Sequence, residues 1–189
     1  MTKAKSGEKT PKLEGLAGAA KDAAPKGPPP VHLWNPPQSG VMNMVITRDG
    51  RWIHEGGEIR REGLVRLFAS ILKREGEDYF LVSPVEKWQI TVEDAPFVGV
   101  DVDVTGMGRA QEVHFTTNLG DTARIDAEHP LRLDQGEVPY VTLRHNLEAR
   151  LDRKSYYRLV DHAVDFDGQI GLWSGGIFFP LTSSNAREG

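Results

Sequence analysis

The sequence Ile59-Arg-Arg-Glu-Gly-Leu-Val-Arg-Leu-Phe-Ala-Ser-Ile-Leu72 returns 92 residues later as Leu151-Asp-Arg-Lys-Ser-Tyr-Tyr-Arg-Leu-Val-Asp-His-Ala-Val164. Apolar residues coincide at seven positions, and two arginines and one leucine are identical. Apolar residues spaced three and four apart are typical of one face of a helix. The repeat therefore predicts two related modules, each built around one helix. We expect the modules to face each other across a seam, and any ligand to bind there.

Strands are predicted on both sides of each helix. Alternating apolar residues, such as the four valines from Val98 to Val104, indicate half-buried strands. Asp49-Gly50 predicts a tight hairpin turn. The predicted helices are Arg61–Glu75 and Arg153–Val164, and the predicted strands are Met42–Thr47, Arg51–His54, Tyr79–Val82, Lys87–Glu93, Val98–Val104, Glu112–Thr117, Thr122–Asp126, Tyr140–Leu143, Ile170–Trp173 and Ile177–Phe179. Two helices cannot cover both faces of a parallel sheet with about ten strands, so we predict an α+β fold with mostly antiparallel sheets.

Composition divides the chain into a tail and two modules. Residues 1–30 are rich in Lys, Ala, Gly and Pro, end in three prolines, and are predicted to be a disordered tail. The N-terminal module is predicted over 31–95 and the C-terminal module over 96–184. Modules of this size are marginal alone, which favours a shared core.

Charge and composition exclude several classes of function. The net charge is −4, but residues 1–30 carry six Lys and three acidic residues, so the remainder is 17 basic against 24 acidic, or −7. Such an acidic body argues against nucleic-acid binding. The chain has no cysteine, which excludes disulfides and thiolate chemistry. It also has no apolar run of ~18–20 residues, so no membrane span is expected, and the protein is predicted to be cytoplasmic.

Motifs with catalytic associations lack the context that the chemistry needs. Asp101-Val-Asp-Val-Thr105 matches the nucleophile loop of haloacid-dehalogenase-like phosphatases, but its aspartates are the polar half of an alternating strand. Ser174 has no strand–elbow–helix context, and Gly106-Met-Gly108 is followed by no helix. The six histidines show no metal-ligand spacing. We predict no catalytic residue, metal or cofactor from these motifs.

A charged stretch near the second helix is the strongest candidate for binding. Arg144, Glu148 and Arg150 precede the helix, and arginine forks suit planar anions such as phosphate or carboxylate. The alternative is a network of surface ion pairs, each contributing only ~0–1 kcal/mol to stability. Both interpretations stay open at this point.

The chain resembles the bacterial family known as domain of unknown function 1285 over most of its length, from about Trp34 to Leu181. The resemblance is carried by several segments in the same order. These are Asp49-Gly-Arg-Trp-Ile-His-Glu-Gly56, Leu64-Val-Arg-Leu-Phe-Ala-Ser-Ile-Leu72, Tyr79-Phe-Leu-Val-Ser-Pro-Val-Glu-Lys87, Val92-Glu-Asp-Ala-Pro-Phe97, Leu147-Glu-Ala-Arg-Leu151 and Trp173-Ser-Gly-Gly-Ile-Phe-Phe-Pro-Leu181.

The resemblance implies two related modules, the second superficially similar to pleckstrin-homology (PH-like) sheets. It also implies a pocket at the module interface for a nucleotide-like molecule, and a role in signalling. The residues here that match its motifs and are expected to bind ligand are Trp52, His54, Glu86, Lys87, Arg144, Glu148, Arg150 and Trp173. Asn43 stands where relatives are expected to carry an acid, and Gly57-Glu58 where a small residue and proline are expected.

Three functions follow from these observations. The first is a small-ligand-binding protein, in which a tryptophan stacks a ring while Arg144, Arg150 and Lys87 hold an anionic group. The second is a hydrolase or transferase that uses His54 with Glu55, Glu86 or Glu148 as acid and base. The third is a protein-interaction module, which an uncovered sheet edge or a large exposed apolar patch would favour.

Overall fold

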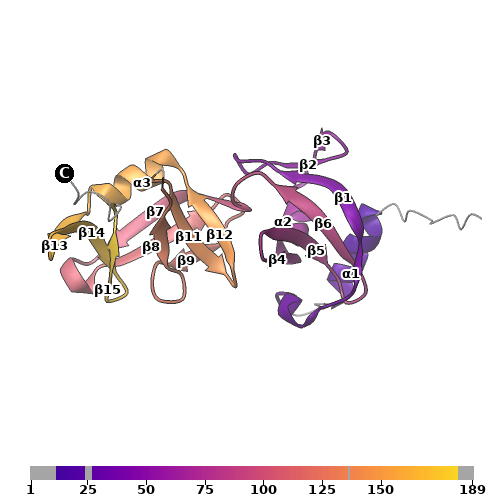
Figure 1. Ribbon diagram of the computed structural model, residues 1–189, viewed down its shortest axis with the longest axis horizontal. Coiled ribbons are helices and arrows are strands. Elements are labelled where there is room, and N and C mark those ends of the chain that lie inside the picture. Colours follow the sequence, from indigo (N-terminus) through magenta and orange to yellow (C-terminus); the bar gives the residue numbers. More distant parts are fainter. Residues whose placement is uncertain (1–11, 24–26, 136, 183–189) are drawn as a thin grey trace, which may run out of the picture. The chain divides into compact units, whose positions relative to one another are not determined.

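The computed structural model describes residues 12–23, 27–135 and 137–182. The chain forms two compact units. The N-terminal unit contains the residues up to Thr47 together with Arg51–Glu93, and the C-terminal unit contains Arg48–Gly50 and the residues from Asp94 onward. Each unit combines helices with sheets (Figure 1).

The N-terminal unit is a six-stranded sheet in the order β3-β2-β1-β6-β5-β4. Its elements are α1 (Leu13–Ala23), a 3-10 helix η1 (Val31–Leu33), β1 (Gln38–Ile46), β2 (Trp52–His54), β3 (Gly57–Glu58), α2 (Glu62–Ser70), β4 (Leu72–Glu75), β5 (Asp78–Val82) and β6 (Lys87–Val92). Among the described strands of this unit, β1 and β6 alone pair in parallel. The core lies where α2 packs on the sheet, with Phe68 stacked on Trp52 at 6.4 Å between ring centroids.

The C-terminal unit contains a six-stranded sheet, ordered β10-β11-β12-β7-β8-β9, and a separate three-stranded sheet, ordered β13-β14-β15. Its elements are β7 (Phe97–Thr105), a 3-10 helix η2 (Gly108–Ala110), β8 (Glu112–Thr117), β9 (Thr122–Arg124), β10 (Leu131–Leu133), β11 (Pro139–Arg144), β12 (Leu147–Leu151), α3 (Arg153–Val160), β13 (Val164–Phe166), β14 (Gln169–Ser174) and β15 (Ile177–Pro180). The helix α3 lies against β7 and beside β14 (Figure 1).

Both units repeat one order of elements. In the first, the antiparallel pair β1–β2 is followed by α2 and the meander β4-β5-β6, and in the second the pair β11–β12 is followed by α3 and the meander β13-β14-β15. The predicted α+β fold with two related strand–helix–strand modules and mostly antiparallel pairing is confirmed. The units differ elsewhere. The first has β3 after its strand pair, and the second has β7–β10 before its own. In addition, β6 joins β1 in a single sheet whereas β13–β15 stays a sheet of its own.

The helices are shorter than the apolar periodicity predicts. The first ends at Ser70 and the second at Val160, and in both repeats the chain then enters a strand. Leu72 pairs with Leu81 across β4 and β5, and Val164 pairs with Gly171 across β13 and β14. A short apolar run fits a strand as well as a helix, and here tertiary pairing decided the outcome.

The prediction of a disordered tail needs correction over Leu13–Ala23, which is the helix α1. Leu16 and Ala20 are buried, and α1 contacts α2. Packing against α2 compensates for the conformational entropy that α1 loses when it becomes ordered. A sequence rich in Ala and Gly buries too little apolar surface to do so alone. Residues 1–11 and 24–26 of the predicted tail lie outside the described residues.

The turn between β2 and β3 offers a stabilising substitution. Glu55 has φ of 49° and Gly56 has φ of 78°, and the flanking residues His54 and Gly57 pair with each other. Asparagine tolerates positive φ better than glutamate does. We expect Glu55→Asn to raise the free energy of unfolding by about 0.5–1 kcal/mol in urea titrations. An unchanged or lower value would show that the contact between Glu55 and Asn43, at 3.3 Å, outweighs the backbone preference.

Candidate functional site

Two of the predicted binding residues, Trp52 and His54, lie on β2 and face the core of the N-terminal unit. Trp52 is 1% exposed, so its ring is unable to stack a ligand. Nε2 of His54 is buried and has no hydrogen-bond partner within the described part of the chain. Its neighbour Glu55 instead accepts a hydrogen bond from Asn43. No contact in that part therefore joins the His54 ring to a carboxylate, as acid–base catalysis would require.

Lys87 is the first residue of β6, and Glu86 lies just before it in a turn closed by Ser83. The backbone N–H of Glu86 donates to Oγ of Ser83 (3.0 Å). Nζ of Lys87 donates to Oε2 of Glu75 (2.9 Å), and Lys73 lies 3.2 Å from the other oxygen of Glu75. The hydrogen bond from Lys87 is the largest influence on the pKa of Glu75, which is lowered despite some desolvation. Lys87 is thus engaged in an internal ion pair.

A bulge in the C-terminal unit separates Arg144 from the other two predicted charged residues. The ladder between β11 and β12 shifts so that Arg144 pairs with Leu147, which is buried. Residues directly opposite on antiparallel strands share a face. Arg144 therefore lies at the apolar face, with its guanidinium 4.9 Å from the Phe97 ring centroid and 3.7 Å from Asp121. Desolvation lowers its pKa, and Asp121 opposes that shift.

The opposite face of β10–β12 is the charged face, defined by Arg132, Tyr140, Glu148 and Arg150. Arg132 and Glu148 form two hydrogen bonds of 2.6 and 2.8 Å, and the Arg132 guanidinium lies 4.5 Å from the Tyr140 ring centroid. This ion pair raises the pKa of Arg132, chiefly through the hydrogen bond to Glu148. Glu148 is therefore an ion-pair partner of arginine here.

Asp94 is the centre of the second half of the charged face. Tyr140 donates to its Oδ1 (2.7 Å), and Nε of Arg150 lies 3.2 Å from its Oδ2. Arg48 lies 3.4 Å from the same oxygen, and its backbone carbonyl accepts a hydrogen bond from Arg150 (3.1 Å). The two predicted ligand residues, Glu148 and Arg150, therefore do share a face, and both already have carboxylate or arginine partners.

Tyr140 is expected to make the stability of the protein depend on pH in the alkaline range. Burial, followed by the hydrogen bond to Asp94, raises its pKa from the ordinary value of 10.0 to about 12. The native tyrosine keeps its proton at a pH where the unfolded one loses it, so stability that is fully present below pH 10 is lost as the pH rises toward 12. We expect a loss of about 1.4 kcal/mol by pH 11.

This loss is measured by urea unfolding between pH 9 and 11. Tyr140→Phe should reduce it to the part that Tyr156 contributes, since burial raises the pKa of Tyr156 as well. Tyr157→Phe, at an exposed position of α3, should retain the full loss. An equal loss in wild type and Tyr140→Phe would contradict the assignment to Tyr140.

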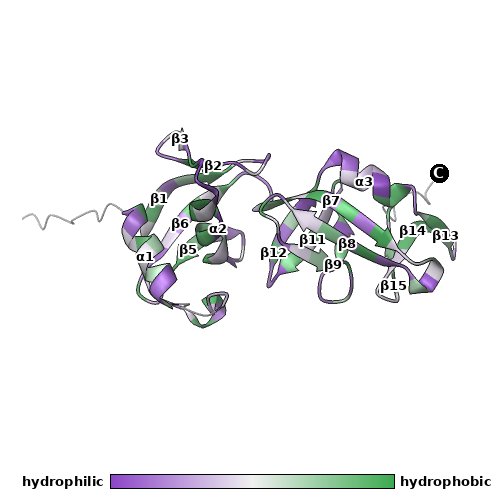
Figure 2. Cartoon of the chain, turned by 180° about the vertical axis from the view of Figure 1, so that it is seen from behind, coloured by the Kyte–Doolittle hydropathy of each residue, from purple (hydrophilic) through white to green (hydrophobic). Residues whose placement is uncertain are grey.

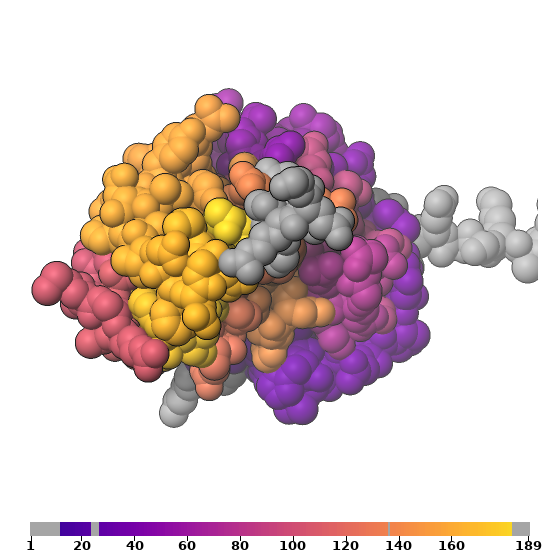
Figure 3. Space-filling model, turned by 60° about the vertical axis from the view of Figure 1, so that its left-hand side comes forward, coloured from indigo at the N-terminus to yellow at the C-terminus, as the bar shows by residue number. Residues whose placement is uncertain are grey.

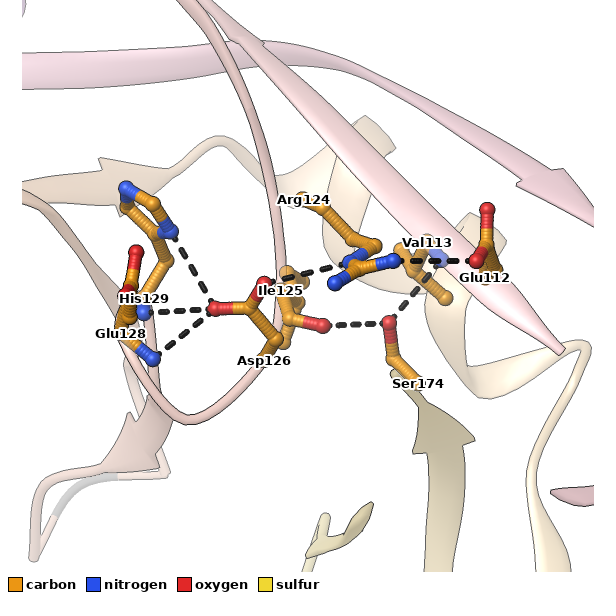
Figure 4. Close-up of polar contacts among 8 residues, drawn as sticks. All are labelled: Glu112, Val113, Arg124, Ile125, Asp126, Glu128, His129 and Ser174. Atoms are coloured by element: carbon orange, nitrogen blue, oxygen red, sulfur yellow. Dashed lines mark hydrogen bonds and ion pairs between the residues drawn. The ribbon is translucent and has the colours of Figure 1, made fainter. Parts of the chain in front are cut away.

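Ser174 is a structural residue that joins the two sheets of the C-terminal unit (Figure 4). It is buried, and its Oγ donates to the Ile125 carbonyl (2.5 Å) and accepts from the Val113 N–H (3.0 Å). The nearby carboxylate of Asp126 binds the backbone and ring of His129, and Arg124. Burial raises the pKa of Asp126, but these hydrogen-bond donors outweigh it and leave the pKa below its usual value. Serine, histidine and aspartate are close here but do not form a nucleophilic relay.

Trp173 belongs to an aromatic face, defined as the outer side of β13–β15 with Val164, Phe166, Trp173 and Phe178. The inner side carries Leu172, Ser174 and Phe179, which are buried, and side chains alternate along a strand. Ring centroids on the aromatic face are 4.9 Å apart for Phe166 and Trp173, 5.4 Å for Trp173 and Phe178, and 5.2 Å for Phe166 and Phe178. The three rings thus form one cluster at tilted and edge-to-face angles.

Gly171 lies directly beneath the Phe178 ring of this cluster. A Cβ at that position would lie 2.6 Å from Cζ of Phe178 and 2.4 Å from the carbonyl oxygen of Phe179. Only a glycine lets the Phe178 ring lie across β14 at this distance. No pattern in the sequence indicates this role for Gly171.

Arg109 of η2 lies over the aromatic face. Its guanidinium is 4.9 Å from the Trp173 ring centroid and 5.7 Å from that of Phe166. The neighbouring Gln111 is buried and donates to the Trp173 carbonyl (2.9 Å), which ties η2 to β14. In the described ranges Arg109 pairs with no carboxylate.

Sequence reasoning missed most of this face. Trp173 was predicted as a binding residue, whereas Phe166, Phe178 and Arg109 were not. The alternation of apolar and acidic residues in Val164-Asp-Phe166 indicates a strand. The predicted helix Arg153–Val164, however, includes the first of these residues. Arg109 lies in a loop between strands, where no periodicity indicates its neighbours.

Residues 29–95 match the domain of unknown function DUF1285, N-terminal domain, and residues 96–181 match the DUF1285 C-terminal domain. The chain belongs to the DUF1285 family. The junction of the two DUF1285 domains falls beside Asp94, and α1 precedes the matched residues.

Two solved structures of DUF1285 family proteins are similar to this chain. The protein from Silicibacter pomeroyi is 51% identical with a TM-score of 0.81, and the match covers 90% of this chain and 96% of that one. The protein from Shewanella baltica is 30% identical with a TM-score of 0.54, covering 65% of this chain and 93% of that one. No curated protein matches the chain. No helix in the described part of the chain has the length and apolar character to cross a bilayer.

Proposed function

We propose that this DUF1285 protein is a protein-interaction module whose C-terminal unit binds a partner through the aromatic face. The observation that supports the proposal is the chemistry of that face, which solvent reaches. Val164 is 45% exposed and Phe166 is 37% exposed, and Met107 beside η2 is 86% exposed. An outward sheet face in a soluble protein is normally polar, and exposed apolar clusters are typical of interaction sites.

The composition of the aromatic face is that of a protein interface. Tryptophan, phenylalanine, methionine and arginine are enriched at interface cores and binding hot spots. Figure 2 shows hydrophobic residues in green along β13 and β14. The topology supplies the physical reason, because β13–β15 does not extend the larger sheet, and η2 with Arg109 leaves Val164 and Phe166 on its outer side exposed.

Binding to the face is favoured over addition of a strand at the edge. The edge strand β13 has three residues and carries Asp165 at its centre. Short edges with a charged residue are a common protection against strand pairing. The aromatic face instead offers exposed apolar side chains, Val164 and Phe166, for a partner to cover.

The proposal is tested by photocrosslinking in cells of the native host. A benzophenone amino acid replaces Val164 in the full chain, and in a matched control it replaces Thr122, an exposed residue of β9 in the other sheet. We expect a discrete adduct from position 164 and none of that mass from position 122. The same adducts from both positions, or none from position 164, would contradict the proposal.

A second candidate is binding of a small anion, such as a nucleotide, at the charged face. The observation that favours it is the presence of three arginines, namely Arg48, Arg132 and Arg150, against the carboxylates of Asp94 and Glu148. Thermal-shift measurements with nucleotides test it, with Arg132→Gln as the variant. Stabilisation that is lost in Arg132→Gln supports this candidate, and no stabilisation at millimolar nucleotide removes it. The ligand seam between the modules stays a prediction.

A further inference from the structure

We infer that the partner presents a carboxylate directly beside an apolar side chain, with the carboxylate bound by Arg109 and the apolar group held on Phe166 and Val164. This inference rests on the proposed interaction through the aromatic face. It deepens that proposal by assigning the chemistry of the partner. The partner is a peptide segment with an aspartate, glutamate or terminal carboxylate next to an aromatic or aliphatic residue.

Arg109 lies where it can bind the carboxylate of the partner. Its guanidinium lies over the rings of Trp173 and Phe166, so within the described residues the side chain contacts aromatic rings and not an acid. Arginine in such a cation–π contact stays charged and has five N–H donors, some of which can bind a planar anion. The hydrogen bond from Gln111 to the Trp173 carbonyl keeps η2 on β14.

Exposed apolar side chains lie near Arg109 and can hold the apolar group of the partner. Val164, Phe166 and Met107 are exposed and lie on β13 and the loop beside η2. Figure 3 shows the orange-to-yellow surface of α3 and β13–β15 next to the pink segment that includes η2. An apolar side chain on Phe166 would therefore lie beside the guanidinium of Arg109, 5.7 Å from the same ring centroid.

The charges around the aromatic face favour binding of a carboxylate over binding of a phosphate group. Within the described residues, Arg109 is the arginine placed over these rings, whereas phosphate recognition usually employs clusters of arginines for its charge of about −1.5 to −2. Asp165, at the centre of β13, and Asp167, in the turn after it, add acidic charge around the small sheet, which disfavours a doubly charged group more than a singly charged one. A monoanion with an apolar neighbour is thus the best complement to this surface.

The test is an NMR titration of the full chain that follows the indole N–H of Trp173. The probes are 3-phenylpropanoate, its neutral isostere 3-phenylpropanamide, and phenyl phosphate. We expect 3-phenylpropanoate to shift the signal with millimolar affinity and the amide to bind about tenfold more weakly. Arg109→Gln should remove the preference for the acid and Arg109→Lys should keep part of it, because lysine retains the charge without the planar fork. The control Arg153→Gln, which makes the same charge change on α3, should behave as wild type.

Several outcomes would overturn the inference. Equal affinity for acid and amide, a preference for the acid that survives Arg109→Gln, or tighter binding of phenyl phosphate would each do so. A dimer in sedimentation that dissociates on Phe166→Ser would show that a second copy is the occupant instead. If no probe shifts the signal while the adduct at position 164 persists, the carboxylate assignment fails and the proposed interaction stands. Loss of both the shift and the adduct contradicts the proposed interaction itself.

Discussion

Ser174→Ala should lower the free energy of unfolding of the C-terminal unit by about 3–4 kcal/mol. The hydroxyl is buried and makes two hydrogen bonds, one to the carbonyl of Ile125 and one from the N–H of Val113. Alanine leaves both backbone groups buried and unsatisfied, and each costs about 1–3 kcal/mol. The loss is a large fraction of the ~5–15 kcal/mol that stabilises a typical domain.

A second buried serine provides the matched control. Ser155 on α3 is as buried as Ser174, but its Oγ has no hydrogen-bond partner in the described ranges. Ser155→Ala removes an unsatisfied hydroxyl, so we expect unchanged stability or a gain of up to about 1 kcal/mol. Chemical denaturation of both variants distinguishes the two serines. Equal losses would contradict the role of Ser174 as the hydrogen-bonded link between the sheets.

Phe166→Ser is the variant with the largest expected effect on binding. The ring is partly exposed and touches Trp173 and Phe178, so its loss should cost about 1–2 kcal/mol of stability. An aromatic hot spot contributes about 2 kcal/mol or more to binding, which corresponds to a loss of roughly 30-fold or more in affinity for the crosslinked partner. Affinity is measured by calorimetry with the purified partner.

The control for Phe166→Ser is an exposed apolar residue elsewhere. Val85 lies on the turn before β6 and is 74% exposed, and Val85→Ser makes a similar polar substitution away from the aromatic face. We expect its affinity for the partner to equal that of wild type. A matching loss in both variants would indicate a general effect of surface polarity and would argue against a hot spot at Phe166.

Much of the fold follows from short-range patterns in the chain. The two-residue period predicts Glu112–Thr117 with the ends that β8 has, and Asp49-Gly50 lies in the turn between β1 and β2. The 92-residue repeat matches the strand pair, helix and three further strands that both units contain in that order. Each strand, turn and helix in these patterns is specified by residues that are close together in sequence, so the local pattern is enough to predict it.

Features that depend on distant residues could not be predicted in this way. The bulge that turns Arg144 to the apolar face arises from pairing between β11 and β12, and β12 itself was not predicted. Trp52 was expected on a binding surface, but packing of Phe68 on the sheet makes it core. Arg109 and Phe166 are 57 residues apart and meet only because Gln111 holds η2 on β14.

The most direct test of the aromatic face as the interaction surface is the yield of the position-164 adduct in wild type and in Phe166→Ser. Both proteins carry the crosslinker in place of Val164, and circular dichroism first shows that both are folded at the working temperature. We predict that the adduct falls by about tenfold or more in Phe166→Ser, because the ring beside the crosslinker anchors the partner. An undiminished adduct in the folded variant would contradict the account.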